Sequence, residues 1–178
     1  MGNTSDLAEV LADYLIAPDP GAAGLTRAVT GRNEHGEPVA LSVVEERPLT
    51  IYLNRQEIVT AMTIGDYPEY LALGFLRNQG MLSPDEDILR VDYDEELETV
   101  VVRTASETSY EEKLQKKTRT SGCAVGTVFG DMMEGLEGVQ LPATPVKSSW
   151  LYALAHKINR TPSLYLEAGA IHGTVLCQ

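Results

Sequence analysis

The sequence has few cysteines and few basic residues. Its two cysteines, Cys123 and Cys177, lie far apart in the chain. Two isolated cysteines do not form a disulfide framework, so we expect a reducing compartment such as the cytoplasm. The chain has fourteen Lys and Arg residues and twenty-six Asp and Glu residues, which gives a net charge of -12. This acidic balance argues against general binding to nucleic acid or to an anionic membrane.

Long apolar runs are absent as well. No window approaches the roughly 18 consecutive apolar residues that a membrane-spanning helix needs. The stretch Met1–Val10 has neither a basic flank nor a long apolar run, so we expect no signal peptide. The 178 residues are 43% hydrophobic and 22% charged, which is ordinary for a globular protein with a sizeable core. We predict a cytoplasmic protein that binds neither nucleic acid nor membrane.

The order of secondary-structure elements predicts an α+β or α/β fold. Residues 6–16 have the periodicity of an amphipathic helix, which prolines end and a short linker follows. Later β-branched runs predict strands, with Arg47-Pro48 as an interruption and 54–57 as a hairpin turn. These predicted strands span 38–46, 49–53, 58–64, 88–93, 99–103 and 163–167.

Two further helices are predicted around glycine and proline signals. Asp66 is expected to cap the first, with Pro68 in its first turn and its end at Gly80. Gly74 within it suggests close approach by another backbone. Ser148 or Ser149 is expected to cap the second, which Thr161-Pro162 ends.

Three other segments have weaker patterns. Residues 109–117 are polar and favour a helix, and 171–178 begin another element after a sharp turn at Gly169. Acidic residues cluster between the predicted strands 88–93 and 99–103. Their consecutive spacing, without a central glycine, favours a solvated hairpin turn over a metal site.

The strongest candidate for chemistry is the stretch from Thr118 to Thr127, which contains Cys123. Glycines bracket this cysteine and let the backbone turn sharply. Lys116, Lys117 and Arg119 come just before it. A thiol near positive charge ionises more easily, and the thiolate is the reactive form. A buried, inert cysteine is the alternative.

Other chemistries have less support in the sequence. There is no phosphate-binding glycine loop and no Gly-x-Ser-x-Gly elbow. The cysteines and histidines lack the paired spacing of zinc ligands or of deaminases, so no zinc is expected. Cys123 and His172 could form a nucleophile–base pair, although an isolated histidine is as readily explained by a bond to backbone. Thiol exchange, in which a persulfide is accepted and passed on, fits best.

Four segments resemble the formate dehydrogenase accessory proteins of the FdhD type. The resemblance covers residues 26–178, and its most specific part is a Leu-Ala-x-Gly-Phe-Leu helix and the turn after it. The matching segments are Glu46–Leu49 with Ile51 and Asn54, Leu71–Leu82, Arg119–Cys123 and Glu167–His172.

This resemblance implies a sulfur carrier, a sulfurtransferase if it is active as an enzyme. It implies that Cys123 takes a persulfide from a cysteine desulfurase and passes sulfur to the molybdenum cofactor, in its guanine dinucleotide form, for formate dehydrogenase. Lys117, Arg119, Ser121, Gly122 and His172 are the residues expected to bind that cofactor. A homodimer is implied too. The alternative is a noncatalytic module that binds the cofactor or formate dehydrogenase.

The resemblance also implies a domain organisation. It predicts a helix and linker over 1–25, a β-rich domain over 26–117, and the persulfide loop with the start of a cytidine-deaminase-like α/β layer over 118–178. The chain departs from the family in two ways. Gly126 stands where many members have a second cysteine, and members continue past the histidine segment. A separate chain is one possible source of that remaining part.

Overall fold

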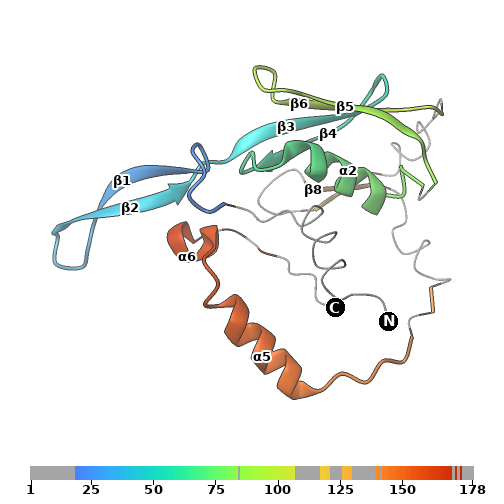
Figure 1. The fold of residues 1–178 in the computed structure, drawn as a ribbon. Helices are drawn as coiled ribbons and strands as arrows, with labels where there is room; N and C mark the ends of the chain where they lie inside the picture. The colour runs from blue at the N-terminus through green and yellow to red at the C-terminus, as the bar shows by residue number, and fades with distance from the viewer. Residues whose placement is uncertain are drawn as a thin grey trace, which may run out of the picture.

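The computed structural model describes residues 19–83, 85–106, 117–120, 126–129, 139–140, 142–169, 171 and 173 (Figure 1). For 117–120 and 126–129 it describes the backbone alone. The predicted helix over 6–16, most of the predicted helix over 109–117 and nearly all of the predicted element over 171–178 lie outside these residues. Within the described ranges, no helix is long and apolar enough to cross a membrane.

A four-stranded sheet in the order β4-β3-β6-β5 forms the centre of the fold (Figure 1). It consists of two antiparallel hairpins, β3–β4 and β5–β6. A parallel pairing joins them, from Thr50 opposite Thr99 to Leu53 opposite Val102. The strands are β3 (Arg47–Leu53), β4 (Gln56–Thr63), β5 (Ile88–Asp94) and β6 (Thr99–Thr104). Both predicted hairpins are therefore confirmed.

The hydrophobic core lies between this sheet and helix α2 (Pro68–Asn78), which packs against β5 and β6. Side chains alternate across a strand, so every second residue of β3 and β6 faces the helix. The buried residues of the core are Leu49, Ile51, Leu53, Ile58, Val59, Ala72, Leu76, Met81, Leu82, Val100 and Val102.

Helix α2 begins differently from the sequence prediction. Its N-cap is Tyr67, with a left-handed φ of 46° and no capping side-chain hydrogen bond. The expectation that Asp66 caps the helix is wrong, because the cap position falls one residue later. Pro68 is the first helical residue, as predicted, since its fixed φ suits that position and it has no N–H to leave unpaired.

The end of α2 is closed by backbone hydrogen bonds around Gly80. Gly80 has φ 64°, which glycine adopts without strain. Its N–H donates to the Arg77 carbonyl, and Met81 N–H donates to the Leu76 carbonyl at 2.8 Å. This is a Schellman motif, and the predicted stop is confirmed. The expectation for Gly74 is wrong: it is exposed, and apart from its own helix backbone and chain neighbours no atom lies within 4 Å of where a Cβ would be.

The break before β3 lies earlier than predicted. Arg47 and Pro48 belong to β3, and the chain leaves β2 (Pro38–Val44) through residues 45 and 46. Pro48 is tolerated in the strand because the pairing with β6 begins only at Thr50. Its missing N–H therefore costs no hydrogen bond of the parallel ladder.

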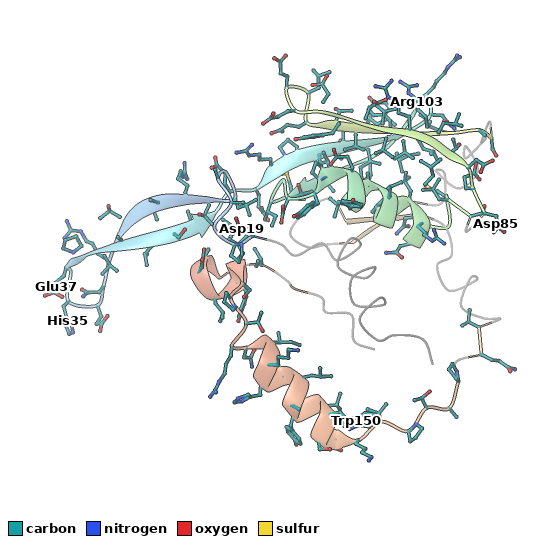
Figure 2. All side chains as sticks on the ribbon, viewed as in Figure 1. Asp19, His35, Glu37, Asp85, Arg103 and Trp150 are labelled. Carbon is teal, nitrogen blue, oxygen red and sulfur yellow. The ribbon has the colours of Figure 1, made fainter. Side chains whose placement is uncertain are left out.

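Strands β1 (Thr26–Arg32) and β2 form a separate two-stranded arm that projects from the sheet (Figure 1). Its tip carries His35 and Glu37 (Figure 2). The side-chain oxygen of Asn33 accepts hydrogen bonds from the backbone N–H groups of both, at 3.0 and 2.9 Å. Asn33 therefore holds the turn by an Asx-type contact.

The predicted strand over 163–167 is wrong. Residues Leu164–Ala168 form the short helix α6, which packs against β2. The Ser163 hydroxyl accepts from Leu166 N–H at 3.4 Å and caps the helix. Gly169, with φ 65°, follows as the C-cap. The turn expected at Gly169 is present, although it follows a helix.

Helix α5 (Ser148–Ile158) lies where the sequence predicts a helix that ends before Thr161-Pro162. Its N-cap is Lys147, so neither Ser148 nor Ser149 caps it. None of its residues is buried. The fold class, mixed α+β, is confirmed, whereas the cytidine-deaminase-like layer and the domain boundaries remain predictions.

Leu76 should contribute more to stability than any exposed residue of its helix. Its side chain is 0% exposed, whereas Leu71 on the same helix is 42% exposed. We expect Leu76→Ala to lower the free energy of unfolding by about 2–5 kcal/mol through the lost burial and the remaining cavity. Urea denaturation measures it, with Leu71→Ala as the control. Equal losses in both variants would contradict this assignment of the core.

Asp66 should destabilise the fold at neutral pH. Burial raises the pKa of the Asp66 carboxyl above its usual 3.8, and the nearby Asp19 carboxylate raises it further. The folded state therefore holds the proton more tightly than the unfolded state, and stability from this group falls as the pH rises. We expect Asp66→Asn to stabilise at pH 7 by no more than about 1 kcal/mol, since solvent screens the partly exposed group.

Thermal melting from pH 7 down to pH 4 measures this effect. The gain from Asp66→Asn should shrink as the pH falls toward 3.8, the usual value. The exposed carboxylate Asp85 (Figure 2) supplies the control variant Asp85→Asn. A gain that is constant with pH would rule out the raised pKa as its cause.

Candidate functional site

The candidate cysteine lies in sequence between two paired strands. Strands β7 (Lys117–Thr120) and β8 (Gly126–Phe129) form an antiparallel hairpin. Their innermost pair is Thr120 opposite Gly126. The stretch read from sequence as one glycine-flanked loop therefore has strands at both ends. The sequence did contain a signal for these two strands, because threonine, valine and phenylalanine favour strands.

The predicted site residues fall into two groups. Lys117 and Arg119 lie on the β7 backbone, paired with Phe129 and Thr127. The other four, Ser121, Gly122, Cys123 and His172, lie outside the described residues. Their proximity to one another, and to the two basic residues, remains a prediction.

In the described part of the chain that precedes β7, a cluster of hydrogen bonds is centred on Asn54, which directly follows β3. Asn54 has a left-handed φ of 55°. Its backbone N–H donates to the Val102 carbonyl at 2.7 Å. Its side-chain oxygen accepts from Thr104 N–H at 2.9 Å. Its amide nitrogen donates to the Thr104 hydroxyl at 3.0 Å and to the Ser106 carbonyl at 3.1 Å.

These contacts extend the parallel pairing of β3 with β6 beyond the end of β3. The side-chain amide of Asn54 supplies an acceptor and a donor, as another residue of β3 would. Thr104 is buried, at 8% exposed, so its polar groups need these partners. Asn54 thereby holds the chain through Ser106, after which the sequence leads to β7.

Sequence reasoning noted Asn54 only as part of a turn and of a family resemblance. Asparagine adopts left-handed backbone more readily than other non-glycine residues, and it carries both a donor and an acceptor. Both properties follow from the residue type alone. Its partners Thr104 and Ser106 lie about fifty residues later, and only the folded chain identifies them.

A shallow, open pocket borders this cluster. Arg103 (Figure 2) lines it, and its guanidinium lies 3.6 Å from the Asp92 carboxylate. Arg55 lines it from the β3–β4 turn. The pocket residues are Leu53, Asn54, Arg55, Gln56, Leu89, Arg103, Thr104, Ala105 and Ser106. Its two charged lining residues are both arginines, and the open shape gives the pocket no specific ligand chemistry.

The acidic cluster of the β5–β6 hairpin is a turn, as predicted. Residues 95–98 join the two strands. Asp92 forms ion pairs with Arg90 and Arg103. Across the part of the chain that the structure describes, no group of three or more His, Cys, Asp or Glu side chains could hold a metal ion.

Asn54 should be difficult to replace. Asn54→Gly keeps the left-handed backbone but leaves the Thr104 N–H without its partner, which should cost about 1–3 kcal/mol. The Thr104 hydroxyl keeps its bond to the Ser106 carbonyl. Asn54→Ala should cost about 1–2 kcal/mol more, because a Cβ disfavours this conformation. Urea denaturation of both variants measures the two effects separately. Wild-type stability in Asn54→Gly would show that the side-chain bonds contribute nothing.

Comparison with known proteins identifies relatives. Residues 44–178 match the FdhD/NarQ family, a span that includes α2, the β7–β8 hairpin and Cys123. A sulfur carrier protein FdhD from Listeria monocytogenes is 26% identical over 145 residues, covering 79% of this chain and 56% of that protein. One from Bacillus subtilis is 28% identical over 154 residues, covering 82% and 57%.

The chain thus spans a little over half the length of these curated relatives. Among solved structures, a candidate formate dehydrogenase accessory protein from Desulfotalea psychrophila is 22% identical, with a TM-score of 0.39. That match covers 44% of this chain and 34% of the other. The family match covers well over half of the chain, and the protein belongs to the FdhD/NarQ family.

Proposed function

We propose that this protein is a sulfur carrier whose thiol, Cys123, bears a persulfide. The observation that carries the proposal is the family match over residues 44–178, which includes the cysteine and the hairpin strands on either side of it. The curated relatives are named as sulfur carrier proteins. A cysteine between two paired strands also suits exchange, because the strands limit the backbone freedom at both ends of the connection.

Loading follows ordinary thiol exchange. The Cys123 thiolate attacks the outer sulfur of a persulfide on a cysteine desulfurase, which is the proposed donor. A sulfur–sulfur bond forms at Cys123 as the donor's sulfur–sulfur bond breaks, and the donor cysteine leaves as a thiolate. The exchange moves one sulfur atom without net oxidation or reduction.

Release requires a second thiol. When a thiol attacks the inner sulfur of the Cys123 persulfide, a disulfide forms and the outer sulfur leaves as sulfide. Gly126 occupies the position at which many family members have a second cysteine. With no cysteine at position 126, another molecule is the proposed source of the attacking thiol, and a mixed disulfide with Cys123 is the product.

The residues near Cys123 in sequence have proposed supporting roles. Lys117 and Arg119 place positive charge shortly before the thiol, which favours its thiolate and attracts anionic molecules. With Ser121, Gly122 and His172, they are the proposed contacts for the molybdenum cofactor in its guanine dinucleotide form. The cofactor is the acceptor of sulfur, formate dehydrogenase is the proposed client, and the carrier is proposed to act as a cytoplasmic homodimer.

A noncatalytic binding module is the second candidate. The exposed side of α2 favours it, since Leu71 and Tyr70 are both uncovered on a helix whose other side forms the core. Such a module would bind the cofactor or formate dehydrogenase through this helix without a covalent step. Its function would survive loss of the Cys123 thiol.

The persulfide can be tested by mass. We expect the protein, incubated with a cysteine desulfurase and cysteine, to gain the mass of one sulfur atom. Cys123→Ala should abolish the gain, whereas Cys177→Ala, the matched control for the other thiol, should keep it. Intact-protein mass spectrometry, with and without a reductant that removes persulfide sulfur, measures the gain. A gain that persists in Cys123→Ala, or no gain in the wild type, would refute the carrier role and favour the binding module.

A further inference from the structure

One side of helix α2 carries a row of exposed apolar side chains. Tyr67, Tyr70 and Leu71 are 39%, 59% and 42% exposed. Their spacing of three and four residues places them on one side of the helix. The rings of Tyr67 and Tyr70 pair, with their centroids 6.1 Å apart. Gly74, one turn further along, leaves a gap in the row because it has no side chain. We call the row from Tyr67 to Gly74 the outer face of α2.

The outer face lies opposite the side of α2 that forms the core. Ala72 and Leu76 are buried, so the helix is apolar on two sides, and a helix of that kind normally packs on both. Arg77 adds a positive charge at the end of the helix. It is exposed, and among the described residues it forms no ion pair.

The amphipathic segment predicted over residues 6–16 has the complementary composition. This segment lies outside the described residues. Among residues 1–25 the sequence has no Lys or Arg, whereas Asp6, Glu9 and Asp13 are acidic. The segment therefore combines an apolar row with negative charge. The apolar residues that recur with helical spacing are Leu7, Val10, Leu11, Tyr14 and Leu15.

The linker after this segment lies beside the entry to α2. Asp19, the first described residue, is at the base of the β1–β2 arm (Figure 2). Arg47 contacts both the linker and the loop that leads into α2. Its guanidinium donates to the Gly24 carbonyl at 3.4 Å, and its Cδ lies 3.9 Å from where a Cβ on Gly65 would be. The linker and this loop are therefore neighbours.

Electrostatics place Asp19 near the same loop. Burial raises the pKa of the Asp66 carboxyl, and the Asp19 carboxylate raises it further. Asp66 directly precedes Tyr67, the N-cap of α2. Three residue steps separate Ile16 from Asp19, and three steps span at most about 11 Å. The end of the segment is therefore held close to the start of α2.

We propose that residues 6–16 form a helix that lies antiparallel to α2 and covers its outer face. The segment and α2 both have eleven residues, which as a helix is about 16 Å. Because Ile16 is held at the start of α2, a segment that follows α2 from there runs antiparallel to it. The antiparallel arrangement also brings the opposite ends of the two helix dipoles together.

This direction aligns the apolar rows and the charges. Counted from the shared end at about 1.5 Å per residue, Leu11 comes level with Leu71, and Asp6 comes level with Arg77. Asp6 flanks the apolar row of its helix on the side that faces Arg77 when the two rows meet. An apolar contact along the helices therefore ends in a pair of opposite charges.

The short linker favours this segment over another molecule. A segment tethered to the same chain reaches an effective concentration in the mM range, with which a separate protein or a second copy has to compete. The inference goes beyond the proposed function, because it assigns the outer face to the chain itself. A partner that binds at α2, as in the second candidate function, would have to displace residues 6–16.

The accessibility of a thiol on the outer face tests the contact. The full chain carries Cys123→Ala, Cys177→Ala and Leu71→Cys, which leaves one thiol. Leu11→Asp then places a charge in the proposed contact. Ala12→Asp, the matched control, adds the same charge on the other side of the predicted helix. Mass spectrometry of the intact protein measures the rate of alkylation by iodoacetamide, and circular dichroism confirms that each variant is folded.

We expect Leu11→Asp to speed alkylation about tenfold, because the covered thiol is then open more of the time. Ala12→Asp should leave the rate unchanged. Equal rates in the parent protein and in Leu11→Asp, or an equal increase in both variants, would overturn the proposal. Since Cys123 is absent from these proteins, the result does not depend on the persulfide chemistry, and a refuted persulfide would leave the contact standing.

A disulfide identifies the molecule that covers the outer face. In the same background, Leu71→Cys is combined in turn with Leu7→Cys, Leu11→Cys and Leu15→Cys and treated with a mild oxidant. We expect a disulfide within one chain, strongest for Leu11→Cys, because only close Cβ atoms can be bridged. Leu97→Cys, on the exposed β5–β6 turn, replaces Leu71→Cys in the control and should give none. No bond within a chain at any of the three positions, or a bond only between two chains, would overturn the proposal.

Discussion

The parallel pairing of β3 with β6 is the contact on which the rest of the structure depends. It joins two hairpins that would otherwise be separate, and a lone hairpin is marginally stable in water. It also places the buried residues of β3 and β6 side by side under α2. Asn54 extends the pairing past the end of its strand, with both its backbone and its side chain. One residue type thus completes the sheet, because it combines a left-handed backbone with paired donor and acceptor groups.

The described core and the proposed chemistry occupy different parts of the chain. The sheet and α2 account for nearly all of the buried side chains, and the cysteine follows them in sequence, between β7 and β8. In this arrangement the core supplies stability, and the later hairpin provides the thiol. Gly126, in place of a second cysteine at that position, has a chemical consequence of its own. Without a neighbouring thiol, the proposed carrier depends on another molecule to release its sulfur.

Charge is distributed unevenly along the chain, and the basic and acidic segments form separate elements of the structure. The basic segment, residues 138–166 with three basic and no acidic side chains, contains a helix with no buried residue, whereas the acidic cluster forms a fixed turn at the far end of the sheet. Neither surface has a covering element in the described structure.

Sequence alone determined the features set by local chemistry. Alternation and β-branched residues predicted both hairpins, Pro68 and Gly80 predicted the ends of α2, and the family resemblance rested on short motifs. Tertiary structure decided what depends on distant neighbours: the parallel pairing of β3 with β6, the partners of Asn54, and the exposed state of Gly74. It also decided that residues 164–168 are a helix, because the Ser163 cap and packing on β2 outweigh the strand propensity of a short apolar run.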